Sequence, residues 1–127
     1  MGFEIVSRGA KQAARNPFLL SWILRHMSFA LPVERLCETE TLLAFHHPAP
    51  AYALHILLVP KRAIANLMEL DPESDAEFLA DVYTTVQELV RRFGLARGGY
   101  RLVVNGGDYQ DFQYLHFHLI TDALPGK

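Results

Sequence analysis

Two histidines separated by one apolar residue, His116 and His118, lie in the segment QYLHFHLITD near the C-terminus. Because successive side chains of a strand point to opposite faces, both imidazoles would share one face with Tyr114 and Ile120. The other face carries only apolar side chains and is predicted to be core: Leu115, Phe117 and Leu119. Two imidazole rings held side by side can bind a phosphate or a metal ion, which sheet packing alone does not require.

A third histidine, His55, opens the apolar run LHILLVP and alternates with Leu57 and Val59. It would share the face of the histidine pair if the two strands are neighbours. A lone histidine at the edge of a strand is more often structural than catalytic, and the H-x-H pattern suits metal binding as well as phosphate binding. His46 and His47 flank a proline-rich loop, HPAPAYA, and are expected to face solvent or to act at a hinge.

The apolar patterns also predict the elements that position these side chains. VERLCETETLLAFHH predicts two short strands around a turn, and LHILLVP predicts a strand that Pro60 ends, because proline cannot continue a ladder. GGYRLVVNGG and YLHFHLI predict the last two strands, joined by a loop of about ten residues.

DPESDAEFLADVYTTVQELVRRFG, residues 71–94, predicts one long helix that Asp71 caps and Gly94 ends. Apolar residues at helical spacing form its buried stripe: Phe78, Leu79, Val82, Val86, Leu89, Val90 and Phe93. The predicted fold class is therefore α+β, an antiparallel meander sheet with one long helix packed on one face.

The N-terminal part is predicted to be a separate helical extension, residues 1–31, followed by one domain over residues 32–127. Asn16 followed by Pro17 is a good helix start, and the apolar run that follows is too short to span a bilayer. This helix is expected to pack on the core or on a partner subunit; peripheral contact with a membrane surface is the alternative.

Composition indicates an ordinary globular protein, with 127 residues, half of them hydrophobic, and a net charge of −2. This charge provides no general attraction to nucleic acid or to anionic membranes. The single cysteine, Cys37, excludes an internal disulfide and a thiolate metal cage, so a reducing, cytoplasmic setting is expected. Cys37 itself is expected to be a small buried hydrophobe.

Three stretches together resemble the histidine triad (HIT) family of nucleotide hydrolases and transferases: LLAFHHPAPAYALHILLVPKR, GYRLVVNGG and LHFHLI. In that family a strand ends in a phenylalanine, and a histidine opens the next strand, which finishes in VPK. Phe45, His55 and residues 59–61 match this pattern at the same separations, and Asn105 matches the asparagine after the penultimate strand. The family motif His-φ-His-φ-His-φ-φ, with φ apolar, falls on residues 114–120.

The resemblance implies an HIT-like fold and a reaction at the α-phosphorus of a nucleoside phosphate, a phosphoramidate or a dinucleoside polyphosphate. His116 matches the nucleophile, which forms a nucleotidyl-histidine intermediate. His118, His55 and Asn105 would donate hydrogen bonds to phosphate oxygens, and no metal or other cofactor is required. Such proteins are commonly homodimers, so a nucleotide substrate and a second copy of the chain are the expected partners.

The chain also departs from the family pattern. Tyr114 replaces the first histidine of the motif, and a phenol cannot become cationic near neutral pH. His47 replaces an aspartate that contacts ribose hydroxyls, while Gln110 and Asp111 lie in a shortened loop whose family counterpart contacts the phosphate or the leaving group. The candidate substrate-binding residues are therefore Asn105, Gln110, Tyr114, Phe45 and His47.

Two alternatives to catalysis of this kind remain. The first is a nucleotide-sensing module on the same fold, in which Tyr114 marks the loss of catalysis. The second is a zinc site made of His55, His116 and His118, since three imidazoles suit zinc and leave a fourth position open.

Overall fold

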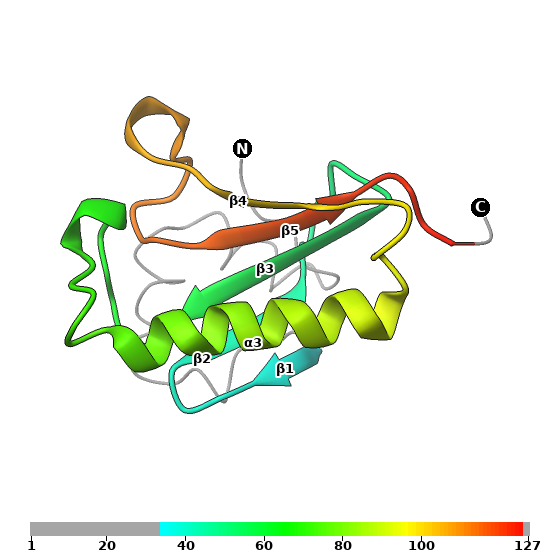
Figure 1. Cartoon of the computed structure of the whole chain (residues 1–127). Coiled ribbons are helices and arrows are strands. Elements are labelled where there is room, and N and C mark those ends of the chain that lie inside the picture. The colour runs from blue at the N-terminus through cyan, green and yellow to red at the C-terminus, as the bar shows by residue number, and fades with distance from the viewer. Residues whose placement is uncertain (1–33, 126–127) are drawn as a thin grey trace.

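The computed structural model describes residues 34–125, so the predicted N-terminal helix in residues 1–31 lies outside the described residues. Within the described residues, five strands and one long helix form the framework (Figure 1). Their bounds are β1 Arg35–Glu38, β2 Leu42–His46, β3 Leu54–Pro60, α3 Ala76–Phe93, β4 Arg101–Val104 and β5 Phe117–Thr121. Residues 34–125 also contain two short 3-10 helices, η2 over Leu67–Glu69 and η3 over Gly107–Tyr109.

The strands form one antiparallel sheet in the order β1-β2-β3-β5-β4. The predicted α+β class, an antiparallel sheet with one long helix packed on it, is confirmed. The order differs from a strict meander at one point, because β5 lies next to β3 and β4 takes the edge of the described sheet. Burial accounts for this order: every residue of β5 is buried, whereas β4 is exposed or half-buried and tolerates an edge.

Helix α3 lies across one face of the sheet (Figure 1). Its buried stripe packs against alternate strand residues, which include Leu115, Phe117 and Leu119 as predicted. Gly94 ends the helix in a left-handed conformation, with φ at 66°, and its N–H bonds back to carbonyls of the last turn. The predicted core and the predicted end of the helix are therefore both correct.

The start of α3 differs from the prediction by several residues. Asp71 caps a separate turn, because its carboxylate accepts hydrogen bonds from the N–H of Glu73 and the hydroxyl of Ser74. The helix itself begins at Ala76, with Asp75 as its N-cap residue. Asp71 therefore caps the turn before α3 and is not the N-cap residue of the helix. Among the described residues, no helix is both long and apolar enough to cross a membrane.

Candidate functional site

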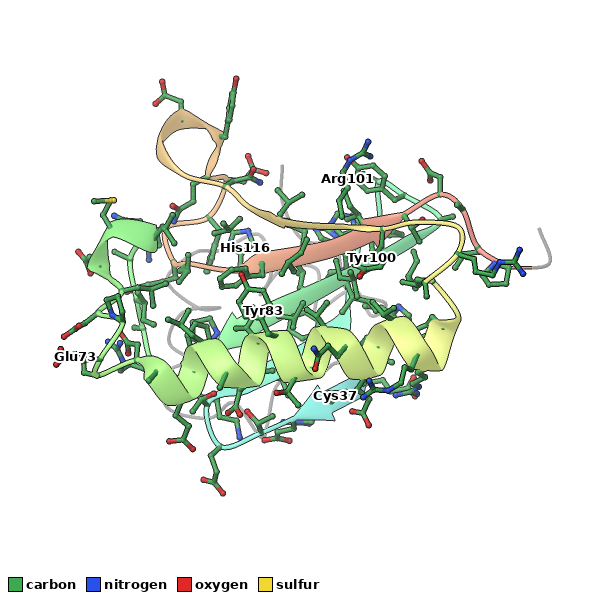
Figure 2. All side chains as sticks on the ribbon, in the orientation of Figure 1. Cys37, Glu73, Tyr83, Tyr100, Arg101 and His116 are labelled. Carbon is green, nitrogen blue, oxygen red and sulfur yellow. The ribbon has the colours of Figure 1, made fainter. Side chains whose placement is uncertain are left out.

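The sheet register brings the predicted histidines together on the face opposite α3. His55 on β3 pairs with Ile120 on β5, and the next pair in the same register is Leu57 with His118. His116 immediately precedes β5, and Figure 2 shows it at the beginning of that strand. All three imidazoles are at least 95% buried, at 3%, 5% and 4% exposure for His55, His116 and His118. The predicted convergence of three histidines is therefore correct.

A directed pair of hydrogen bonds fixes the protonation of His55 and His118. The N–H of Ala51 donates to Nδ1 of His55 at 3.2 Å, so the neutral ring of His55 carries its proton on Nε2. That Nε2 lies 2.8 Å from Nδ1 of His118 and donates to it, so the expectation that His55 donates to a phosphate oxygen is wrong. His118 must then carry its own proton on Nε2, an atom that is buried without a hydrogen-bond partner among the described residues. This orphaned N–H is suited to donate to an oxygen of a bound ligand.

His116 holds the opposite tautomer from His55 and His118. Its Nδ1 lies 2.9 Å from the carbonyl oxygen of Tyr114. Because a carbonyl can only accept, Nδ1 carries the proton and Nε2 carries the lone pair. The ring of Phe112 meets that of His116 edge-on at 6.1 Å, and the His116 and His118 rings are 4.9 Å apart. A nucleophilic nitrogen and a hydrogen-bond donor therefore lie on adjacent rings.

Burial keeps these rings neutral. It is the main cause that lowers the pKa of His118 to about 4, and the neighbouring His116 and His55 lower it further while the charge of Asp111 opposes them. Burial also lowers the pKa of His116 and of His55. The Tyr114 carbonyl and Asp111 act in the opposite direction on His116. At neutral pH, His116 is therefore neutral and Nε2 carries its lone pair.

The other predicted site residues occupy different positions around the histidines. Phe45 lies on β2 opposite Leu57, in the same cross-strand row as His118, and is buried. Asn105 directly follows β4, whose last residue pairs with Phe117, so the register places it across from His116.

Two loop residues are used in ways that the sequence did not indicate. Tyr114 contributes its backbone carbonyl to His116, while its ring meets Phe112 at 5.9 Å. The side-chain amide of Gln110 donates to the carbonyls of Ala65 and Phe112, at 2.8 and 2.9 Å. Gln110 therefore ties together the loops that precede η2 and β5.

The expectation that His47 faces solvent is wrong. Its side chain is 3% exposed, and its ring lies 4.3 Å from that of His55. The loop after β2 turns back over the sheet, and the N–H of Ala49 donates to Nδ1 of His47 at 2.9 Å. His46, one residue earlier on the opposite face, is exposed as expected.

The supporting contacts of the loop between β2 and β3 were also missed. The N–H groups of Ala49 and Ala51 hold two imidazoles, and the carboxylate of Asp122 accepts from the N–H of Ala53 at 2.9 Å. The Tyr52 ring meets His55 edge-on at 5.4 Å. The only sequence signal was the shortness of this loop and its small residues, which allow the backbone to approach the rings.

The geometry does not support the zinc alternative. Nε2 of His55 and Nδ1 of His118 are joined by a hydrogen bond, whereas ligands of one metal ion must each direct a lone pair at it. Within residues 34–125, no group of three or more His, Cys, Asp or Glu side chains is arranged to hold a metal ion.

A groove of about 780 Å³ lies between η2 and η3, and Phe112 in its lining contacts the His116 ring. Asp111 and Phe112 belong both to its lining and to the surroundings of His116. The groove also exposes apolar side chains, with Met68 at 87% and Leu67 at 47% exposure. Its described lining contains one carboxylate and no lysine or arginine.

Comparison with known proteins gives a consistent result. Residues 29–123 match the profile described as the HIT domain. An uncharacterized HIT-like protein of Synechococcus elongatus is 38% identical over 92 residues, covering 71% of this chain and 79% of the relative. Another from Azospirillum brasilense is 33% identical over 98 residues, covering 76% of this chain and 80% of the relative.

Solved structures show the same similarity. A HIT family hydrolase from Clostridium thermocellum superposes with a TM-score of 0.68 at 33% identity, over 78% of this chain and 87% of that one. A HIT family hydrolase from Legionella pneumophila superposes with a TM-score of 0.69 at 29% identity, over 78% of this chain and 89% of that one.

Proposed function

Because the chain belongs to the histidine triad (HIT) family, we propose that it hydrolyses or transfers the nucleotidyl group of a nucleoside phosphate derivative, with His116 as the nucleophile. The observation that carries this proposal is the hydrogen bond from Nδ1 of His116 to the Tyr114 carbonyl. It leaves the lone pair on Nε2, beside the orphaned N–H of His118. This arrangement suits attack on a phosphorus atom whose oxygens need hydrogen-bond donors.

The proposed reaction has two displacements. Nε2 of His116 attacks the α-phosphorus, an N–P bond forms, and the leaving group departs with the electrons of its bond to phosphorus and takes up a proton. A water oxygen then attacks the same phosphorus and loses a proton, while the N–P electrons return to Nε2. The products are a nucleoside monophosphate and the protonated leaving group. Another acceptor in place of water would make the reaction a transfer.

His118 has a separate role in this scheme. Its Nε2–H would donate to a phosphoryl oxygen, and His55 would hold the ring in the required tautomer through the 2.8 Å hydrogen bond. Removal of a preorganised donor of this kind typically costs about 2.7–4 kcal/mol of transition-state stabilisation. The amide of Asn105, across from His116, is proposed as a further donor.

The groove between η2 and η3 favours a class of leaving group. It adjoins His116 through Phe112, exposes the apolar Met68 and Leu67, and carries the charge of Asp111. The described lining holds no lysine or arginine that would bind a chain of phosphates. An amine or an uncharged apolar group would be accepted, so a phosphoramidate is preferred over a dinucleoside polyphosphate.

The test is the release of AMP from adenosine 5′-phosphoramidate, with a diadenosine polyphosphate as the comparison substrate. His116→Ala should lower the rate on the order of 10³-fold or more, because the nucleophile is lost. Mass spectrometry of rapidly quenched wild-type protein should detect a nucleotidyl adduct on His116. His46→Ala, a change to an exposed histidine on the other face, serves as the control.

The outcomes separate the candidate functions. A wild-type rate equal to the His116→Ala background would refute the enzyme proposal for this substrate. Tight nucleotide binding without turnover would instead favour the sensing module, which the replacement of a motif histidine by Tyr114 also allows.

A further inference from the structure

His47 packs on the histidine site without belonging to the motif that forms it. Its ring lies 4.3 Å from the His55 ring at an interplanar angle of 31°, and 6.4 Å from the His118 ring at 22°. The backbone N–H of His47 also donates to the carbonyl of His55 at 2.7 Å, which fixes the two residues side by side. One face of His55 is therefore covered by another flat ring and shielded from water.

The loop between β2 and β3 fixes the rings of His47 and His55 in the same way, through backbone N–H groups. The N–H of Ala49 donates to Nδ1 of His47, and two residues later the N–H of Ala51 donates to Nδ1 of His55. Both imidazoles consequently carry their protons on Nε2. Tyr52, between these anchors and His55 in sequence, covers the His55 ring edge-on. Besides its contact with His118, the orientation of His55 thus depends on the rings of His47 and Tyr52 and on the Ala51 N–H.

We propose that His47 is a positioning residue for the reaction: its ring shields His55 and keeps it oriented to donate to Nδ1 of His118. This inference rests on the proposed function, because the result of that orientation is the N–H that His118 directs toward the phosphate. The catalytic roles remain with His116 and His118. The flat ring of His47 matters for this role more than its hydrogen-bonding nitrogen does.

The pKa values of the histidines around His55 can be measured to test this role of His47. In the part of the chain that the structure describes, the titratable groups around His55 are His47 after β2, His116 and His118 at β5, Tyr52 in the adjacent loop and, near the β5 rings, Asp111. Burial is the main cause that lowers the pKa of His47 to about 3, and it also lowers the pKa of His55. Water that replaced the His47 ring would stabilise the charged forms, so the pKa of His55 and of His118 would rise toward the ordinary value.

The sign of the effect on activity follows directly. The neutral rings form the directed hydrogen bonds and keep the His116 lone pair, so activity is present above the pKa values of His55, His116 and His118 and is lost as pH falls through the highest of them. If that pKa rises, the acid limb of the kcat/KM profile moves to higher pH. A purely structural role of His47 would lower stability without moving this limb.

Two substitutions separate the ring of His47 from its nitrogen. His47→Phe keeps a flat ring against His55 and loses the acceptor for the Ala49 N–H. His47→Asn keeps an acceptor near the position of Nδ1 and loses the ring. His46→Asn makes the same change one residue earlier, on the opposite face, and is the matched control.

The experiment is an NMR titration of the histidine side chains in the full chain, followed by pH profiles of AMP release. His47→Asn should raise the pKa of His55 and His118 by roughly one pH unit or more. It should also lower kcat roughly 10- to 100-fold with a much smaller change in KM. His47→Phe should lower the melting temperature but keep both pKa values and the acid limb close to those of the wild type. If His47→Asn does not fold, His47→Gln, which also removes the ring, replaces it with the same expectation for the pKa values.

The proposal is overturned if His47→Asn titrates like His46→Asn, or if His47→Phe shifts the pKa values as strongly as His47→Asn. The titration does not require turnover, so it is independent of the proposed function. Unchanged titration together with normal AMP release would refute only the role of His47. Shifted titration without any AMP release would refute the reaction and leave the packing role of His47 standing.

Discussion

At the scale of single residues, the direction of two hydrogen bonds separates the roles of two neighbouring histidines. His116 faces a carbonyl, which can only accept, whereas His118 faces a ring nitrogen that already carries a proton. The two rings share one face of the sheet but hold opposite tautomers. One ring therefore offers a lone pair and the other an N–H, as attack on a phosphoryl group requires.

Replacement of Tyr114 tests directly what the first position of the histidine motif contributes to this chemistry. A phenol can donate a hydrogen bond but cannot become cationic near neutral pH, whereas an imidazole can carry and deliver a proton there. Since the contact to His116 uses the backbone carbonyl, Tyr114→His preserves it. We expect Tyr114→His to raise kcat for AMP release by roughly tenfold or more, because a general acid–base group is gained.

The control for this prediction is Tyr114→Phe, which removes only the hydroxyl. A loss of activity in the phenylalanine variant would show that the phenol contributes a hydrogen bond to the wild-type reaction. A Tyr114→His variant that is no faster than the wild type would contradict the prediction. Steady-state kinetics with adenosine 5′-phosphoramidate over a range of pH measures both variants.

At the scale of elements, the sequence indicated most of the framework because its patterns follow burial. Alternation in β3 and β5 placed their histidines on one face, and the helical stripe of α3 identified the opposite, apolar face. Local patterning did not reveal the order of the last strands. The strand order follows from burial. The fully buried β5 lies beside β3, whereas the less buried β4 takes the edge of the described sheet.

The misjudged details of the site have a common physical cause. His47 was assigned to solvent because a proline-rich loop usually lies on the surface, yet backbone N–H groups of that loop turn inward to the rings. Asp71 is a residue type that commonly caps helices, but here it caps the turn that precedes α3. Both outcomes depend on loop geometry, which residue type alone does not determine. Whether Asn105 and Phe45 contact a substrate stays a prediction.

The bridge formed by Gln110 yields a prediction about the loops. Gln110→Ala would leave the carbonyls of Ala65 and Phe112 without this donor and would loosen the loop beside His116. We expect the free energy of unfolding to fall by about 1–3 kcal/mol. We also expect kcat for AMP release to fall, because Phe112 packs on the nucleophile.

Chemical denaturation and kinetics on the same preparation test this expectation. Glu73→Ala removes a side chain of similar size from an exposed position in the turn before α3 and is the control. If both variants lose equal stability and keep full activity, the bridge has no special role in the site.

At the scale of the whole molecule, one edge of the described sheet and part of α3 lie open to solvent. Strand β4 pairs only with β5 within the described residues, and Tyr100, which precedes β4, is 46% exposed. Tyr83 on α3 is 60% exposed (Figure 2). An open strand edge is a ready pairing surface, and a symmetric dimer covers the same surface on both copies.

We therefore predict a homodimer in which β4 and α3 of one copy meet those of the other. Light scattering at micromolar concentration should give the mass of two chains. Tyr83→Asp places a charge on the proposed interface and should shift the population toward monomer, since burial of an unpaired carboxylate is costly. Tyr109→Asp makes the same change at an 81% exposed position in η3, outside β4 and α3, and should leave the mass unchanged. A wild-type chain that stays monomeric under these conditions, or equal dissociation by both variants, would contradict an interface at this edge.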